Sequence, residues 1–186
     1  MKKITLYTAL ALLVALNVPV YAQDEPPALF GPRTDYTVPS EAAALSGADF
    51  DGDGSQDLVA AIWPLNRVSV LLNNGDGSFA PRTNYATGAS PVSISSADFD
   101  GDGYNDLVIA NAQSDNVSVL LNDSDGSFAP KVDYATPDAP QGVFSADLDG
   151  DGDQDLAVGN CRSDDVSVLL NNGDGTFANT GAYATR

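Results

Sequence analysis

Histidine is absent from this 186-residue chain, and other residues that carry chemistry are scarce. The single cysteine, Cys161, excludes an internal disulfide framework. The only glutamates are Glu25 and Glu41, and most of the remaining acids lie in repeated turns. A general acid and base therefore have few places to lie near one another, and we expect a protein that is not an enzyme.

Positive charge is also scarce, with eight basic residues against 26 acidic ones and a formal net charge of −18. This balance disfavours nucleic acid and anionic membrane surfaces as partners. The acids are unevenly spread, because 13 of the 26 fall in three short segments. That distribution is typical of cation sites and not of an evenly solvated surface.

Only one long hydrophobic run is present, Ile4–Val20, and two lysines precede it. Because a small-residue cleavage site follows at Ala22, the sequence predicts a signal peptide over residues 1–22 and a secreted or cell-surface protein. The alternative is a membrane anchor, which the shortness of the run and its Pro19 oppose. No second run could span a bilayer, so we expect no membrane span after cleavage. A proline-containing linker over residues 23–29 is predicted next.

The three acidic segments share the pattern Asp-x-Asp-Gly-Asp-Gly-x-x-Asp, and each copy begins 49 residues after the last. They occupy Asp49–Asp57, Asp98–Asp106 and Asp147–Asp155. Alternate carboxylates of an extended backbone converge, and a glycine at the sixth position allows the sharp turn that a calcium loop needs. The carbonyl at position seven and the carboxylate at position nine would complete an all-oxygen site.

We therefore predict about three Ca²⁺ ions, one in each loop. An acidic turn without metal is the plain alternative. An EF-hand is disfavoured because its loop needs a terminal Glu and flanking helices. The predicted ligands are Asp49, Asp51, Asp53, Ser55 and Asp57 in the first loop, Asp98, Asp100, Asp102, Tyr104 and Asp106 in the second, and Asp147, Asp149, Asp151, Asp153 and Asp155 in the third.

The 49-residue period extends beyond the loops and covers residues 30–186, which predicts a propeller or solenoid. Each unit is rich in β-branched residues and turn signals, so the expected fold class is all-β. In the second unit the expected strands are Pro91–Ala97, Leu107–Ala110, Val117–Leu121 and Ser127 to about Thr136. Four antiparallel strands make one propeller blade. The predicted fold is a partial β-propeller with blades at about 41–88, 89–137 and 138–186, plus a leading strand at 30–40.

Other repeated residues favour structural roles. The Asn-Gly-Asp-Gly turn at Asn73 and its copies at Asn122 and Asn171 predict hairpins. The recurring phenylalanines and tyrosines predict packing between blades, and they are Phe79, Phe128, Phe177, Tyr85, Tyr134 and Tyr183. Trp63 replaces Ala112 and Cys161 of the other units, so it is a candidate for a private contact.

The combination of these loops, a Val-Ser-Val-Leu-Leu-Asn strand and an Asn-x-x-Asp-Gly-[Ser/Thr]-Phe turn resembles the FG-GAP or VCBS-type repeats of integrin-like β-propellers. The resemblance covers nearly all of the chain after the signal. It implies blades with calcium between strands one and two, in extracellular proteins with adhesive, ligand-binding or carbohydrate-related roles. The fold alone does not name a ligand.

Three blades do not close a ring of about seven, the number that the resemblance implies. We expect either part of a longer propeller or an open array that self-associates through its blade faces. The predicted function is a non-catalytic binding or adhesion scaffold for an extracellular protein or glycan. The alternative is a carbohydrate-binding or accessory domain of a carbohydrate-active protein, with a sugar site at Trp63 or Tyr104.

Overall fold

The computed structural model describes residues 35–185. All that follows concerns the compact unit Thr37–Arg186. The predicted signal peptide, the linker and residues 30–34 of the predicted leading strand lie outside the described residues. Residues 35–40, the rest of that predicted leading strand, do not form a strand. Over the part of the chain that is described, no helix is long and apolar enough to cross a bilayer.

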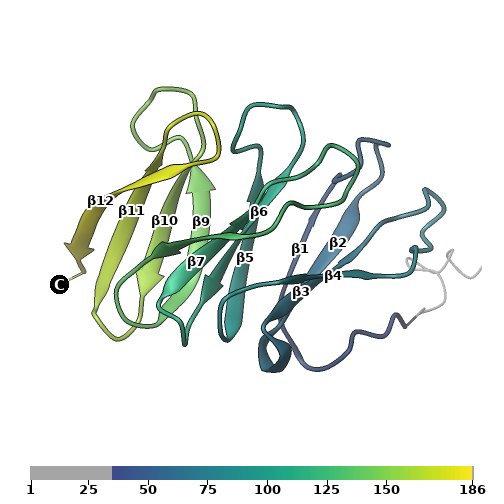
Figure 1. Ribbon diagram of the computed structural model, residues 1–186, viewed down its shortest axis with the longest axis horizontal. Coiled ribbons are helices and arrows are strands. Elements are labelled where there is room, and N and C mark those ends of the chain that lie inside the picture. The colour runs from purple at the N-terminus through teal and green to yellow at the C-terminus, as the bar shows by residue number, and fades with distance from the viewer. Residues whose placement is uncertain (1–34, 186) are drawn as a thin grey trace, which may run out of the picture. The chain divides into compact units, whose positions relative to one another are not determined.

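This unit consists of three four-stranded antiparallel sheets that lie side by side (Figure 1). In each sheet the strand order follows the chain, which is the meander of a propeller blade. The all-β prediction is therefore confirmed. The first blade contains β1 (Ala42–Ala48), β2 (Asp57–Ile62), β3 (Arg67–Leu71) and β4 (Thr83–Ala86), with a short 3₁₀ turn, η1 (Trp63–Leu65), after β2. The second contains β5 (Pro91–Ala97), β6 (Asp106–Asn111), β7 (Asn116–Leu120) and β8 (Val132–Ala135), and the third β9 (Pro140–Ala146), β10 (Asp155–Asn160), β11 (Asp165–Asn171) and β12 (Phe177–Ala184).

The second strand of each blade is the most buried element. In β6 all six residues are buried, because the strand has a hydrogen-bonded neighbour on each side and a blade against each face. This explains why the segment reads as a continuous apolar run and not as an alternating one. The prediction of a doubly buried strand over Leu107–Ala110 is confirmed.

The fourth strand of the second blade is shorter than predicted. The predicted strand started at Ser127, whereas β8 starts at Val132, and only an isolated bridge joins Phe128 to Asn122. The break in pairing coincides with Pro130, whose fixed φ and missing N–H restrict how the strand can pair, while Ala129 N before it still donates to Leu121 O at 2.8 Å. The first blade has Pro81 at the matching position and an equally short β4, whereas the third has Asn179 and a β12 of eight residues.

Two buried clusters hold the blades together, one at each junction between neighbours. At the first junction Val59 and Val70 of the first blade pack with Ile109 and Leu120 of the second. The second junction repeats this arrangement one blade later, with Val108 and Val119 facing Val158 and Leu169. Each buried side chain of this size contributes about 1.5–3 kcal/mol, so packing between blades is a principal source of stability.

An aromatic side chain anchors each junction. Phe128 makes edge-on contacts with Phe50 and Tyr85 of the preceding blade, at centroid distances of 5.6 and 5.3 Å. Phe177 contacts Phe99 and Tyr134 in the same way, at 5.5 Å each. The prediction of blade-to-blade packing is confirmed for Phe128, Phe177, Tyr85 and Tyr134.

Candidate metal centres

Each acidic loop joins the first strand of a blade to the second, and its first aspartate folds it. In the second loop Asp98 Oδ1 accepts a hydrogen bond from Gly101 N at 2.7 Å, and Asp98 Oδ2 accepts one from Gly103 N at 2.9 Å. Gly103 has a φ of 92°, which a residue with a side chain rarely adopts. The loop therefore bends its backbone around its own carboxylate, as the sixth-position glycine predicts.

The structure brings three predicted ligands together in each loop. In every group one carboxylate oxygen from each residue lies within 4.8 Å of the others. At that separation two carboxylates repel by roughly 3 kcal/mol at an effective dielectric of 20, so a cation would relieve a substantial cost. The donors are all oxygens, which suits a hard cation. The groups are Asp49, Asp51 and Asp53; Asp98, Asp100 and Asp106; and Asp147, Asp149 and Asp155.

Of the remaining predicted ligands, Asp102 has a hydrogen-bond partner outside its loop. Asp102 Oδ2 accepts a hydrogen bond from Ser124 Oγ at 2.9 Å, whereas the first and third blades have glycine at the position of Ser124. This bond holds Asp102 towards the turn between strands three and four, while its counterpart Asp53 joins the first cluster. Asp57 and Asp151 also lie outside these side-chain groups, while Ser55, Tyr104 and Asp153 were predicted to bind through their backbone carbonyls, which the groups do not include.

The ninth-position aspartate has a structural role that the sequence analysis did not identify. Asp106 is fully buried, and its two oxygens accept hydrogen bonds from Phe99 N at 2.8 Å and Asn122 N at 2.7 Å. Asp57 and Asp155 repeat both bonds in their own blades. This residue therefore ties the acidic loop to the turn between strands three and four.

Burial also changes the acidity of this carboxyl. Desolvation raises the pKa of Asp106 to about 6, with a smaller contribution from the charges of Asp100 and Asp102, although the two backbone hydrogen bonds oppose the shift. Burial likewise raises the pKa of Asp57, Asp100 and Asp149. In the absence of a cation these loops resist carrying their full negative charge.

Asparagines at the end of the third strands link neighbouring blades, which the hairpin interpretation missed. Asn122 Nδ2 donates to Phe50 O of the preceding blade at 2.8 Å and to Asn105 O at 3.0 Å. Asn171 Nδ2 makes the matching bonds to Phe99 O and to Gln154 O, at 2.8 and 3.1 Å. The recurrence of this asparagine at the 49-residue period was the available signal, because a hairpin alone does not require that side chain.

The two aromatic candidates for a sugar site have different surroundings. Trp63 is 42% exposed, and its Nε1 donates to Glu41 Oε2 at 3.2 Å. Tyr104 lies over Gly52 of the first loop, close enough that a Cβ added to Gly52 would lie 2.8 Å from Tyr104 Cε1.

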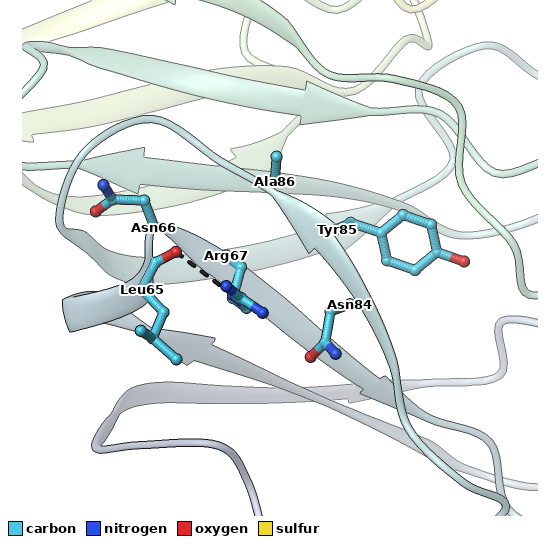
Figure 2. A pocket seen from close by; sticks show the side chains of 6 residues that line it. All are labelled: Leu65, Asn66, Arg67, Asn84, Tyr85 and Ala86. Carbon is cyan, nitrogen blue, oxygen red and sulfur yellow. Dashed lines mark hydrogen bonds between the residues drawn. The ribbon is translucent and has the colours of Figure 1, made fainter.

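A small pocket lies between the end of η1 and the edge strand β4 (Figure 2). Its first lining residue, Leu65, closely follows Trp63 in the sequence. In it Arg67 Nε donates to Leu65 O at 3.4 Å. The lining residues are Leu65, Asn66, Arg67, Asn84, Tyr85 and Ala86.

Comparison with known families gives one match that covers most of the chain. The sequence model of the FG-GAP-like repeat matches residues 49–109, 98–158 and 147–185. Each match begins at the first aspartate of an acidic loop, so the loops are the repeated feature that the family shares. No curated protein matches the sequence.

The solved structures that resemble the fold include the following two. One is a lectin of Agrocybe aegerita that recognises non-reducing terminal N-acetylglucosamine, with 26% identity and a TM-score of 0.56 over 75% of this chain. The other is BBS1N, solved in complex with ARL6DN, with 16% identity and a TM-score of 0.54 over 83% of this chain. The matches cover 37% and 42% of those two chains, so the present chain spans well under half of either.

Proposed function

The chain belongs to the FG-GAP-like repeat family, and from this premise we propose that it is a secreted, calcium-stabilised binding or adhesion scaffold without catalysis of its own. The observation that carries the proposal is the clustering of three carboxylates in each loop. The repetition of the cluster in all three blades supports a structural role for the cation. Because the cluster recurs in every blade, we infer that it stabilises the blade and does not recognise a specific ligand.

The residues of each loop fit a calcium ion. All side-chain donors are carboxylate oxygens, and the loops are exposed enough for an ion to enter. Asp49, Asp98 and Asp147 would hold the ion while their oxygens also accept loop N–H groups. The cation supplies the positive charge that lets several carboxylates ionise side by side. The loop can then keep the bend that brings strands one and two together.

Removal of calcium tests this proposal. Excess chelator should lower the melting temperature of the chain, because an ion that binds only the folded state stabilises it by mass action. Stabilisation of about 2.7 kcal/mol is expected for each site at a calcium concentration 100 times its dissociation constant. Differential scanning calorimetry with calcium, with magnesium and with chelator makes the comparison. An unchanged melting curve would sink the metal assignment.

Glycan binding is a second candidate function, supported by the likeness to the lectin. Trp63 is a suitable stacking surface because it is partly exposed. In the sequence it shortly precedes Leu65, which lines the pocket of Figure 2. A glycan array that includes terminal N-acetylglucosamine, read with calcium and with chelator, tests it. Binding that is lost in Trp63→Ala supports this function, and silence across the array favours the protein-binding scaffold.

A further inference from the structure

The first and second acidic loops touch through a pair of residues that has no counterpart at the next junction. Tyr104 and Asn105 belong to the second loop, yet both contact the first. Asn105 Nδ2 donates to Asp49 O at 3.3 Å, and the Tyr104 ring covers Gly52. The third loop has Asp153 and Gln154 at these positions, and among residues 35–185 no hydrogen bond joins the Gln154 side chain to the second loop.

Both contacts converge on one residue of the first cluster. Asp49 is held at its backbone by Asn105, and its carboxylate Oδ1 accepts a hydrogen bond from Gly52 N at 2.8 Å. Gly52 is the residue that Tyr104 covers, so the ring restrains the peptide that orients this carboxylate. Asp49 thus has its main chain and its side chain fixed with help from the neighbouring blade.

The close approach of Tyr104 depends on the absence of a side chain at Gly52. A Cβ there would lie 2.8 Å from Tyr104 Cε1, whereas a Cβ at Gly101 or Gly150 would meet nothing within 4 Å. Gly52 and Gly101 have nearly the same φ, 75° and 77°. The two glycines therefore share their backbone requirement and differ in the contact with tyrosine.

We propose that Tyr104 and Asn105 are positioning residues for the first cation site, which the second blade completes. The inference rests on the proposed calcium binding and extends it. The first loop gains preorganisation from its neighbour, whereas the second loop receives no matching pair from the third. Calcium affinity in the first loop consequently depends on the identity of two side chains outside it.

The test is a site-resolved calcium titration of the full chain. Glycine-selective ¹⁵N labelling gives separate NMR signals for Gly52 and Gly54 of the first loop, and for the glycines of the other two loops. The double variant Tyr104→Ser with Asn105→Gln gives the second loop the residues that the first loop has at these positions, Ser55 and Gln56, and changes no charge. The expected result is a first-loop midpoint at roughly fivefold higher calcium or more, a typical size for coupling between sites.

Three further readouts separate positioning from general damage. The third-loop midpoint and the metal-free melting temperature should stay unchanged, and the second-loop midpoint should shift by less than the first-loop midpoint, because Tyr104 and Asn105 also belong to the second loop. The control Gln154→Asn should leave all three midpoints unchanged. An unshifted first-loop midpoint in the double variant, or an equal shift in all three loops, overturns the inference. If no glycine signal of the unaltered chain responds to calcium, the proposed function itself fails, and the two failures are thereby distinguished.

Glycine substitutions provide an independent check. Gly52→Ala and Gly101→Ala impose the same backbone strain, but only the first meets Tyr104. Gly52→Ala should therefore weaken the first site more than Gly101→Ala weakens the second, and the excess should vanish when Tyr104 is also replaced by serine. Equal losses in the two alanine variants contradict the proposed contact.

Discussion

A buried aspartate serves two purposes in the second loop. Asp106 belongs to the carboxylate cluster and also accepts hydrogen bonds from the N–H groups of Phe99 and Asn122, both of which are buried residues. A residue with this arrangement contributes to the fold whether or not a cation is bound. Its two functions can be separated by an isosteric change.

At pH 5, where the raised pKa of about 6 leaves Asp106 mostly protonated and little charge is removed, Asp106→Asn should destabilise the metal-free chain by about 1–3 kcal/mol, because the asparagine NH₂ group cannot accept a hydrogen bond from one of the two N–H groups. One of the two bonds in the buried site would then face an NH₂ group. Urea unfolding in the presence of chelator measures the change. Asp125→Asn is the matched control, since Asp125 is exposed. Equal stability of the two variants in chelator would show that Asp106 matters only through the cation.

At the residue scale, sequence patterns identified the acidic loops. They did not show which aspartates of a loop cluster together and which form hydrogen bonds with other turns. Alternation and the glycine position predict which carboxylates converge, and nine of the predicted ligands do so. The hydrogen bond from Ser124 to Asp102 spans 22 residues of the chain, and the contact of Asn105 with Asp49 spans 56 residues. The spacing of residues within a loop does not predict these hydrogen bonds, because their partners lie in other turns that only the fold brings close.

At the scale of the element, the three fourth strands form a natural comparison. The β-branched strands two and three were predictable from composition, whereas the length of the fourth strand depends on one position. Pro81 and Pro130 shorten β4 and β8, and Asn179 permits the longer β12, in which it pairs with Leu169. The prediction of a long fourth strand in the second blade gave too little weight to the missing N–H of proline.

Asn179→Pro should convert the third blade to the form of the other two. Pairing of residues 179 and 180 with β11 should weaken, at a cost of about 1 kcal/mol for a lost hydrogen bond. Native-state hydrogen exchange should become faster at Thr180, whereas Ala178 should stay protected, because its counterparts Ala80 and Ala129 keep their bonds to Leu72 O and Leu121 O although a proline follows. The control Asn179→Ala keeps the N–H and should preserve protection. Unaltered exchange in the proline variant would mean that residue type at this position does not set strand length.

At the scale of the whole unit, the outer face of the third blade carries apolar side chains that the first two blades bury or replace. Leu148 is 45% exposed, whereas its counterparts Phe50 and Phe99 are at most 1% exposed. Phe144 is 64% exposed and pairs with Ala157, on the face that corresponds to the packed face of β6. At the matching position of the second blade Ser95 instead exchanges a hydrogen bond with Ser145 across the junction, at 2.9 Å.

This face should make the isolated chain self-associate, because contiguous exposed apolar surface favours contact with another surface of the same kind. Phe144→Ser, which places the second-blade residue in the third blade, should reduce association by removing the most exposed apolar side chain on the face. Sedimentation velocity over a range of concentrations, at physiological salt so that the acidic charge is screened, measures the effect. Val132→Ser is the control, since Val132 is 53% exposed but lies on the edge strand β8. A chain that stays monomeric at every concentration contradicts the expectation, and an equal effect of both serine variants would assign the association to general hydrophobicity and not to the blade face.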